Sequence, residues 1–310
     1  MSNFDLKLLE KRKTKIFKRQ KNEISKMYLQ ASKEMQKEYM KYKNMNTATG
    51  YLKSSQLEDL LNVMNDNLIE LSNSLNKSIK FNMKKMAEIG IDSNIKLMKG
   101  FGINITGAYA SIPSQVVNDL CTGKIYSSGW SLSRRIWSIK ESNMKDAYNI
   151  VAKGIAENKS TYDIAKELEN YVSPKAKLPW EWSKVYPYSN KVIDYNAQRL
   201  ARTLSNHAYQ KSFIDSTIDN PFIEKYQWEA SGARSCPLCK DRDGQLFNKW
   251  DVPLDHPNGM CNLIPYITKS DEQITNELLN WLDADEGTYP EIDKYAKSLE
   301  INLTSNRITK

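Results

Sequence analysis

The sequence predicts a mainly α-helical, elongated protein with a small β-hairpin knuckle near the C-terminus, and therefore an α+β class overall. Glycine and proline are sparse, with 12 and 10 residues among 310, while Lys, Asn, Glu, Leu and Ile are abundant. This composition favours helix. Long stretches also repeat apolar residues at helical spacing. Residues 222–230 instead alternate large side chains with charges, which is typical of a strand.

Residues 1–48 are predicted to form a basic helical arm. Apolar residues recur through 4–43 in a narrow stripe, so this helix needs a partner surface. Residues 1–43 hold thirteen Lys or Arg and five Asp or Glu, and this excess of eight equals the net charge of the whole chain, +8. Such an arm suits DNA or an acidic protein surface, although a solvated helix face is the commoner origin of a charge run. The candidate contacts are Lys11, Arg12, Lys13, Lys15, Lys18, Arg19 and Lys21.

Residues 49–180 are predicted to form a helical domain. A break is expected at 44–50, then a helix over 54–89, and glycines predict a further break over 90–107. Three later helices are expected. The first opens at Ile112, the second follows residues 129–137 and runs to about Ala156, and the third begins at Ser160 and ends near Pro174. Residues 173–190 contain three prolines and four aromatic residues, which predicts a linker.

Residues 181–268 are predicted to contain an amphipathic helix over 190–218 and a hairpin. The first strand covers 222–230, and the tight turn Asp243-Gly244 leads to a short returning strand at 245–247. Residues 269–310 are expected to be a helical tail, with short helices around Trp281 and Tyr295. No apolar run approaches the ~18 residues that a membrane span requires, so no membrane partner is expected.

Three cysteines and one histidine of the hairpin region form the clearest motif. Cys236 and Cys239 are spaced as C-x2-C, and His256 and Cys261 follow after sixteen and four intervening residues. One tight turn can present two thiolates to a tetrahedral zinc, and the later His and Cys can complete its ligands. Four protein ligands leave no position for water, so such a site is structural rather than catalytic. The alternative is a pair of reduced thiols with His256 capping a turn.

The remaining cysteine and histidine carry no such pattern. Cys121 is expected to be a small core residue rather than a ligand, and His207 is expected to be either a packed or a surface histidine. No Ser-His-Asp or Cys-His nucleophile set can be assembled from two histidines, and no phosphate-binding Gly-rich loop is present. The sequence therefore predicts a protein that is not an enzyme.

Residues 110–268 resemble the phage minor head protein family, whose head morphogenesis domain is typified by Mu F-like and SPP1-like proteins. The matching stretches are Ser131–Trp137, Gly154–Ala165, Ala197–Thr203, Trp228, Gly232–Cys239, Asp243-Gly244-Gln245, His256-Pro257-Asn258, Cys261 and Pro265. The family commonly ends this block with His-Pro-x-Cys-x-Cys, whereas this chain has only Cys261 there. Without metal, the turn at Asp243-Gly244 and the packing of Trp228 and Phe247 would hold the hairpin.

The resemblance implies structural work in a virion. Such proteins associate with the portal or the inner head and take part in head assembly, DNA packaging or ejection. The implied partners are the portal protein and the major capsid or scaffold protein, with phage DNA as a further candidate. The implied location is the phage head, assembled in the bacterial host cytoplasm.

Two other classes of protein remain open. Asp255-His256-Pro257 beside a C-x2-C resembles the Asp-His of metal-dependent HNH nucleases, which need a further Asn or His on a following helix; this chain has no histidine after Cys261, and Asn262 is followed at once by Leu-Ile-Pro. A host-side DNA-binding regulator would need a compact base-reading helix, whereas the basic arm is long and dominated by lysine.

Overall fold

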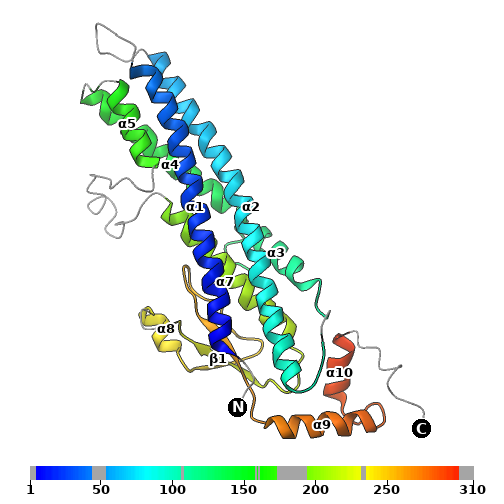
Figure 1. The fold of residues 1–310 in the computed structure, drawn as a ribbon. Helices are drawn as coiled ribbons and strands as arrows, with labels where there is room; N and C mark the ends of the chain where they lie inside the picture. The colour runs from blue at the N-terminus through cyan, green and yellow to red at the C-terminus, as the bar shows by residue number, and fades with distance from the viewer. Residues whose placement is uncertain are drawn as a thin grey trace. The chain divides into compact units, whose positions relative to one another are not determined.

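The computed structural model describes residues 5–43, 54–105, 108–157, 159, 161–172, 194–231 and 235–299. The predicted break at 44–50 and the predicted linker at 173–190 lie outside these residues. The helices are α1 (Leu6–Lys43), α2 (Ser54–Gly100), α3 (Ile112–Thr122), α4 (Leu132–Ala156), α5 (Thr161–Val172), α7 (Tyr195–Thr217), α8 (Pro237–Arg242), α9 (Asp271–Asp283) and α10 (Pro290–Ser298) (Figure 1). The strands are β1 (Lys225–Glu229), β2 (Leu246–Asn248) and β3 (Asn262–Tyr266). The predicted class, mainly α with a small β element, is confirmed. None of the helices in these ranges has the length and apolar character needed to cross a bilayer.

The chain forms two compact units, and neither is continuous in sequence. Unit 1 comprises Met1–Ile16, Asn82–Leu120 and Arg202–Lys310, and unit 2 comprises Phe17–Phe81 and Cys121–Ala201. Four helices, α1, α2, α3 and α7, contribute residues to both units. The sequence predicts consecutive segments, whereas each unit collects stretches that lie far apart along the chain.

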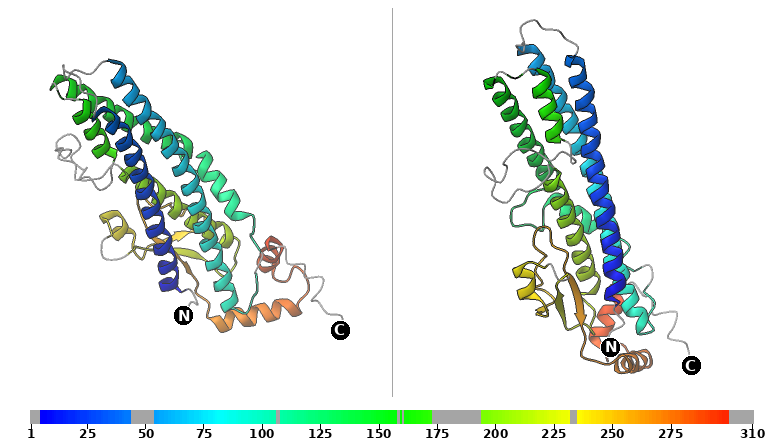
Figure 2. Two further views of the ribbon diagram at one scale, coloured as in Figure 1. Left: turned by 45° about the horizontal axis from the view of Figure 1, so that its top comes forward. Right: turned by 60° about the vertical axis from the view of Figure 1, so that its left-hand side comes forward.

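Unit 2 is built on facing apolar stripes of α1 and α2, which lie side by side (Figures 1 and 2). Residues three or four apart share one face of a helix, and the positions at this spacing are buried. They are Ile24, Tyr28, Ala31 and Met35 on α1, and Leu60, Met64, Leu68, Leu71, Leu75 and Ile79 on α2. Beside this interface between α1 and α2, Ser78 Oγ donates to Glu23 Oε2 at 2.9 Å. The narrow stripe of α1 thus has the partner surface that it needs.

Unit 1 contains a three-stranded antiparallel sheet of order β2-β1-β3. Tyr226 and Trp228 of β1 point inward and are fully buried. The ring of Tyr226 meets the ring of Phe213 on α7 edge to face, with centroids 6.0 Å apart. The sheet therefore packs one face against α7, and the predicted hairpin of 222–230 with 245–247 is present as β1 and β2.

The third strand, β3, is not predicted from the sequence. It is five residues long and contains Pro265, which pairs with Tyr226 of β1. Proline removes a backbone donor, so it is tolerated in a strand at the edge of a sheet. The position of β3 at the edge explains how Pro265 fits and why its stretch lacks a strand pattern.

The C-terminal helices agree with the predicted tail. Ser270 caps α9, since its hydroxyl accepts from Gln273 N while the Gln273 side chain accepts from Ser270 N. Trp281 Nε1 donates to Asp293 Oδ1 at 2.8 Å, and Gly287 N donates to the other oxygen of the same carboxylate at 2.8 Å. One buried carboxylate thus joins α9, the connecting turn and α10.

The predicted break at 90–107 is wrong in its first half, because α2 continues to Gly100. Gly90 is buried in the helix, and a Cβ there would lie 2.6 Å from Tyr209 O and 2.9 Å from Phe213 N. Glycine at this position allows α2 to approach the backbone of α7, so its role is close packing. A glycine that serves helix packing looks the same in sequence as one that ends a helix.

This contact predicts that Gly90→Ala destabilises unit 1. In open space, Gly→Ala within a helix stabilises by roughly 0.5–1 kcal/mol. Here the methyl group meets backbone atoms, so we expect a loss of about 1–3 kcal/mol, as in overpacked cores. Chemical denaturation measures the change in the free energy of unfolding. Lys96→Ala, at an exposed position of the same helix, is the control, and a Gly90→Ala variant as stable as wild type would contradict the packing role.

Candidate metal centre

The C-x2-C pair is formed by the first turn of α8. Cys236 is the N-cap of this helix, with φ −69 and ψ 165, and Pro237 follows at its first turn. Cys236 Sγ accepts from Cys239 N at 3.4 Å. Proline is favoured at the start of a helix because it has no N–H to satisfy there. The local sequence therefore turns both sulfur atoms towards the same side.

His256 and Cys261 bring their side chains to these sulfurs. His256 Nε2 lies 3.2 Å from Cys236 Sγ and 2.9 Å from Cys239 Sγ, and Cys261 Sγ lies 3.2 Å from Cys239 Sγ. Cys239 and Cys261 are buried, and Cys236 and His256 are half-buried. All four predicted ligands are thus brought together into a cluster that could hold a metal ion. Cys121 belongs to no such group among the residues that the structure describes.

The sulfur atoms of the cluster are not bonded to each other. A disulfide has a sulfur–sulfur distance of about 2.05 Å, whereas Cys239 and Cys261 are separated by 3.2 Å. Cys236, Cys239 and Cys261 are all free thiols. The cluster therefore offers three sulfurs and one imidazole nitrogen as separate donors.

The imidazole of His256 is oriented for Nε2 to act as the donor atom. His256 Nδ1 lies 2.9 Å from Pro257 O. Because a carbonyl oxygen only accepts, Nδ1 carries the hydrogen and Nε2 of the neutral ring keeps its lone pair towards the sulfurs. A metal-binding His is usually held in this way by a hydrogen bond at its other nitrogen. Both nitrogens are therefore engaged, and neither is free to serve as a general base.

Asp255 organises the loop of residues 255–261, which carries His256 and Cys261. Its side chain is fully buried. The carboxylate accepts from His256 N and Cys261 N, each at 2.8 Å, and from Asn206 Nδ2 at 2.9 Å. Asp255 also lies close to the sulfurs of Cys239 and Cys261. Since its oxygens are occupied by three N–H donors, we assign it to holding the loop rather than to binding the metal.

Helix α7 fixes the same loop through a stripe of polar side chains. Gln210 Oε1 accepts from Asp255 N at 3.0 Å, and His207 Nε2 donates to Asp255 O at 2.8 Å. Thr203 Oγ1 accepts from Asn258 N at 2.8 Å, and Asn206 Nδ2 donates to Cys261 O at 3.3 Å. These positions are three or four residues apart, so they lie on one face of the helix. Of the two expectations for His207, packed or surface, the structure thus shows the packed one, with the residue buried.

Two loop positions have backbone requirements of their own. Asn258 has a positive φ of 70, a conformation that Asn tolerates better than most residues. A Cβ on Gly259 would lie 2.2 Å from the carboxylate atoms of Asp255. Only glycine leaves room for that carboxylate under the loop. The sequence shows the turn residues His256-Pro257-Asn258 but gives no indication of the buried acid that requires Gly259.

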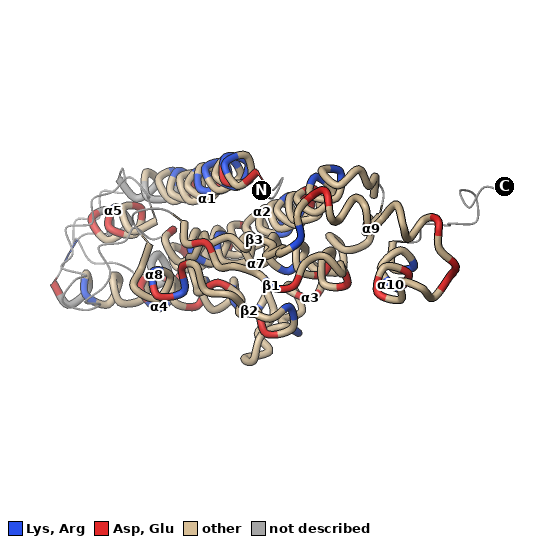
Figure 3. The backbone as a smooth tube through the Cα atoms, turned by 90° about the horizontal axis from the view of Figure 1, so that it is seen from below, with Lys and Arg blue, Asp and Glu red and all other residues tan. Residues whose placement is uncertain are grey.

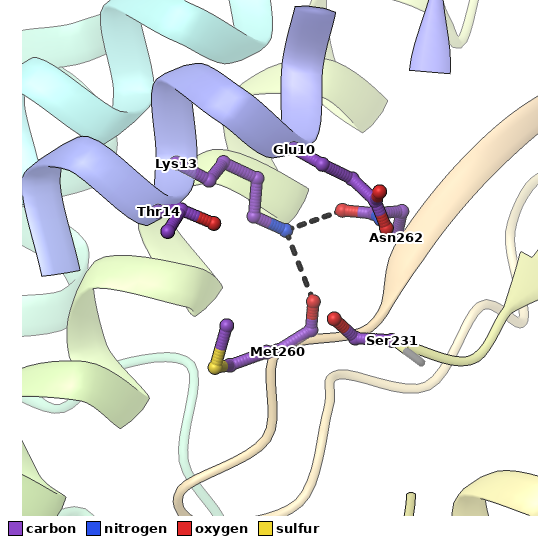
Figure 4. A pocket seen from close by; sticks show the side chains of 6 residues that line it. All are labelled: Glu10, Lys13, Thr14, Ser231, Met260 and Asn262. Atoms are coloured by element: carbon purple, nitrogen blue, oxygen red, sulfur yellow. Dashed lines mark hydrogen bonds between the residues drawn. The ribbon is translucent and has the colours of Figure 1, made fainter. Parts of the chain in front are cut away.

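Lys13 requires a correction to the predicted set of exposed basic contacts. Its side chain is buried, with 2% of the residue exposed, and Nζ donates to Met260 O at 3.3 Å, Cys261 O at 3.2 Å and Asn262 Oδ1 at 2.5 Å. The same ammonium lies 4.2 Å from the ring centroid of Tyr209. Lys13 therefore ties the first turns of α1 to the end of the metal-cluster loop and cannot contact DNA. It also lines a pocket of about 180 Å³ with Glu10, Thr14, Ser231, Met260 and Asn262 (Figure 4).

The other predicted basic contacts also belong to α1, along which Figure 3 shows several blue Lys and Arg positions. Lys11, Lys15, Lys18 and Lys21 are exposed. Arg12 donates to Asp92 Oδ2 at 2.5 Å, and Arg19 pairs with Glu23 at 3.4 Å. The exposed lysines keep the chemistry of a polyanion contact, while the two arginines are engaged within the protein.

The thiols of Cys236 and Cys239 have pKa values that are shifted in opposite directions. The N–H of Cys239, which donates to Cys236 Sγ, lowers the pKa of the Cys236 thiol. Burial raises the pKa of Cys239 far above its ordinary value. Burial also lowers the pKa of Lys13 to about 7, with Asp255, Cys261 and Glu10 acting in the opposite direction. A thiolate at the buried Cys239 therefore needs a cation beside it, which a metal ion would supply.

The predicted packing residues of the knuckle support the hairpin beside the cluster. The rings of Trp228 and Phe247 meet at 6.0 Å and 62°. Asp243 Oδ1 accepts from Ala230 N at 2.8 Å, and Gly244 N donates to Trp228 O at 2.8 Å. Gly244 has a positive φ of 76, which this turn requires. These contacts connect the end of α8 to β1 and keep the C-x2-C turn in place.

Comparison with protein-family models found no match, and neither the curated proteins nor the solved structures contain one that is similar to this chain.

The contacts of Asp255 predict that Asp255→Asn weakens the whole loop. An amide replaces one accepting oxygen by an NH₂ group, which then faces an N–H donor. We expect a loss of about 2–4 kcal/mol in the free energy of unfolding, because buried donors are left unpaired. Metal affinity should fall roughly 10–100-fold, as it does when a residue that orients metal ligands is changed. Asp251→Asn, at an exposed position, should change neither quantity. Equal stability and affinity of the two variants would show that Asp255 does not organise the loop.

Proposed function

We propose that the cluster is a structural zinc site formed by Cys236, Cys239, His256 and Cys261. Three thiolates and one imidazole are the donor set of a tetrahedral structural zinc, and soft sulfur ligands disfavour Mg²⁺ and Ca²⁺. The observation that carries the proposal is a chain of close donor contacts: His256 Nε2 lies 3.2 and 2.9 Å from the sulfurs of Cys236 and Cys239, and Cys261 Sγ lies 3.2 Å from Cys239 Sγ. Zinc would hold α8 and the 255–261 loop together without offering a position for substrate.

The donor set fits the ion with a small expansion. In a tetrahedral site with zinc–sulfur bonds of about 2.3 Å, neighbouring sulfurs lie about 3.8 Å apart. The sulfurs of Cys239 and Cys261 are 3.2 Å apart without the ion, so they need to separate by about 0.6 Å. His256 Nε2, at 2.9 and 3.2 Å from two sulfurs, needs to move outward by a similar amount, because zinc–nitrogen bonds are about 2.0–2.1 Å long.

The proposal predicts a zinc content of about one ion per chain in the purified protein. Cys236→Ser should lower this content and the stability of the protein, because a hydroxyl is a poor ligand for zinc. Cys121→Ser is the matched control, since Cys121 belongs to no candidate cluster in the described parts of the chain. Elemental analysis measures the zinc content, and thermal unfolding with and without a chelator measures its effect on stability. A zinc-free wild type whose unfolding equals that of Cys236→Ser would remove the zinc site.

We further propose that the protein is a non-catalytic minor head protein of a phage. The resemblance of the motifs in residues 110–268 supports this role, as does the local packing of Trp228, Asp243, Gly244 and the four ligands into one knuckle. The exposed lysines of α1 suit contact with the portal, the major capsid or scaffold protein, or DNA. The engaged nitrogens of His256 favour this role over a nuclease.

The head role predicts that this polypeptide is present in purified heads of the phage that encodes it. We expect few copies relative to the major capsid protein, and we expect the portal protein to copurify with it. Quantitative mass spectrometry of purified particles measures both. His256→Ala should leave any DNA cleavage in the preparation unchanged. Particles that lack the polypeptide, or cleavage that disappears in His256→Ala while the fold is retained, would contradict the role.

A further inference from the structure

The exposed side of α4 and the turn before it carry large aromatic side chains. Trp130, Trp137 and Tyr148 are 37%, 48% and 55% exposed. Trp and Tyr that remain in water on one face often mark an interaction site, because they offer large rigid contact areas. All three residues belong to unit 2.

The helical spacing of α4 separates this face from the core of unit 2. Its buried apolar positions include Leu132, Ile136, Ala147, Ile150 and Val151. The exposed positions Arg134, Trp137, Glu141, Lys145 and Tyr148 follow one another at intervals of three or four residues, so they form a single outward stripe. The aromatic residues are therefore arranged along a stripe and not scattered.

Basic side chains hold the aromatic rings in place. The guanidinium carbon of Arg134 lies 4.4 Å from the ring centroid of Trp130, and Lys140 Nζ lies 4.3 Å from that of Trp137. Arg135 donates to Trp130 O at 3.1 Å and to Ser128 Oγ at 3.2 Å. Cation–π contacts of this kind restrict both partners. These contacts favour one arrangement of Trp130 and Trp137 before any partner binds, which lowers the entropic cost of association.

The charge of the face is mainly positive. Arg134, Lys140 and Lys145 accompany the aromatic residues, and Glu141 is the acidic residue within the stripe. Asp146 lies beside the stripe, and its carboxylate accepts from Tyr171 O–H at 2.8 Å. Aromatic side chains with arginine are the residues that most often dominate protein–protein binding energies. The complementary surface is apolar and acidic.

We propose that this stripe, together with the neighbouring Trp130 and Lys140, is a docking surface for an acidic, amphipathic segment of a partner protein. Carboxylates of the partner pair with Arg134, Lys140 and Lys145, and its apolar side chains cover Trp137 and Tyr148. Single-stranded nucleic acid, whose bases also stack on aromatic rings beside basic side chains, is the competing occupant that the test separates; Glu141 within the stripe opposes a continuous track of phosphates. The surface depends neither on the metal centre nor on the head role.

The test uses the full chain and three defined probes. The first is a synthetic helical peptide with Glu and Leu at amphipathic spacing, the second is its counterpart with Lys in place of Glu, and the third is a single-stranded oligothymidine. Tryptophan fluorescence and calorimetry measure binding. We expect the acidic peptide to bind with an affinity about tenfold or more above that of the basic peptide.

Variants separate the surface from general charge effects. Trp137→Ala combined with Tyr148→Ala, and separately Lys140→Glu combined with Lys145→Glu, should each weaken binding of the acidic peptide about tenfold. Lys33→Glu, an exposed lysine of α1 in the same unit, should have little effect. Circular dichroism checks that all variants are folded. No difference between the two peptides, equal binding by all variants, or tighter binding of oligothymidine would overturn the proposal.

Discussion

The cluster depends on one buried carboxylate. Asp255 gives up hydration on folding, and a charge in such a place is tolerated only when hydrogen bonds and opposite charge replace water. Two backbone N–H groups of its own loop and the amide of Asn206 supply the hydrogen bonds. The ammonium of Lys13, which donates to Met260 O and Cys261 O, supplies positive charge nearby. These partners hold His256 and Cys261 against the C-x2-C turn.

The two pairs of candidate ligands are positioned by different parts of the chain. Cys236 and Cys239 are arranged by six residues of local helix, so spacing alone predicts them. His256 and Cys261 are arranged by α7 and α1, which lie far away in the sequence. The sequence identifies all four donors because Cys and His are rare in this chain. It does not assign Asp255, Gln210 or Lys13 to the support of the cluster, since acids, amides and lysines are common and nothing local indicates these roles.

Some helices and strands of the fold are likewise determined by their own sequence, and others by contacts with residues distant in the sequence. Helices with clear apolar stripes, such as α1 and α2, are predicted because their pattern is intrinsic. The continuation of α2 through Gly90 and the strand β3 with Pro265 are missed because both depend on neighbours. Lys13 shows this dependence on distant residues most clearly. Its sequence context is that of a solvated lysine, and only the packing of unit 1 places its ammonium among carbonyl oxygens.

The contacts that α7 makes with the 255–261 loop are directed mostly at main-chain atoms: Asp255 N, Asp255 O, Asn258 N and Cys261 O. Hydrogen bonds to main-chain atoms do not depend on which side chain the residue carries. The residues at the positions of Pro257 and Met260 can therefore change during evolution without altering the backbone conformation of the loop, provided that Asp255 and Gly259 are retained. Proteins that share this architecture can thus diverge widely in sequence, and a search for them is better anchored on the polar face of α7 and the Asp-x3-Gly pair than on overall identity.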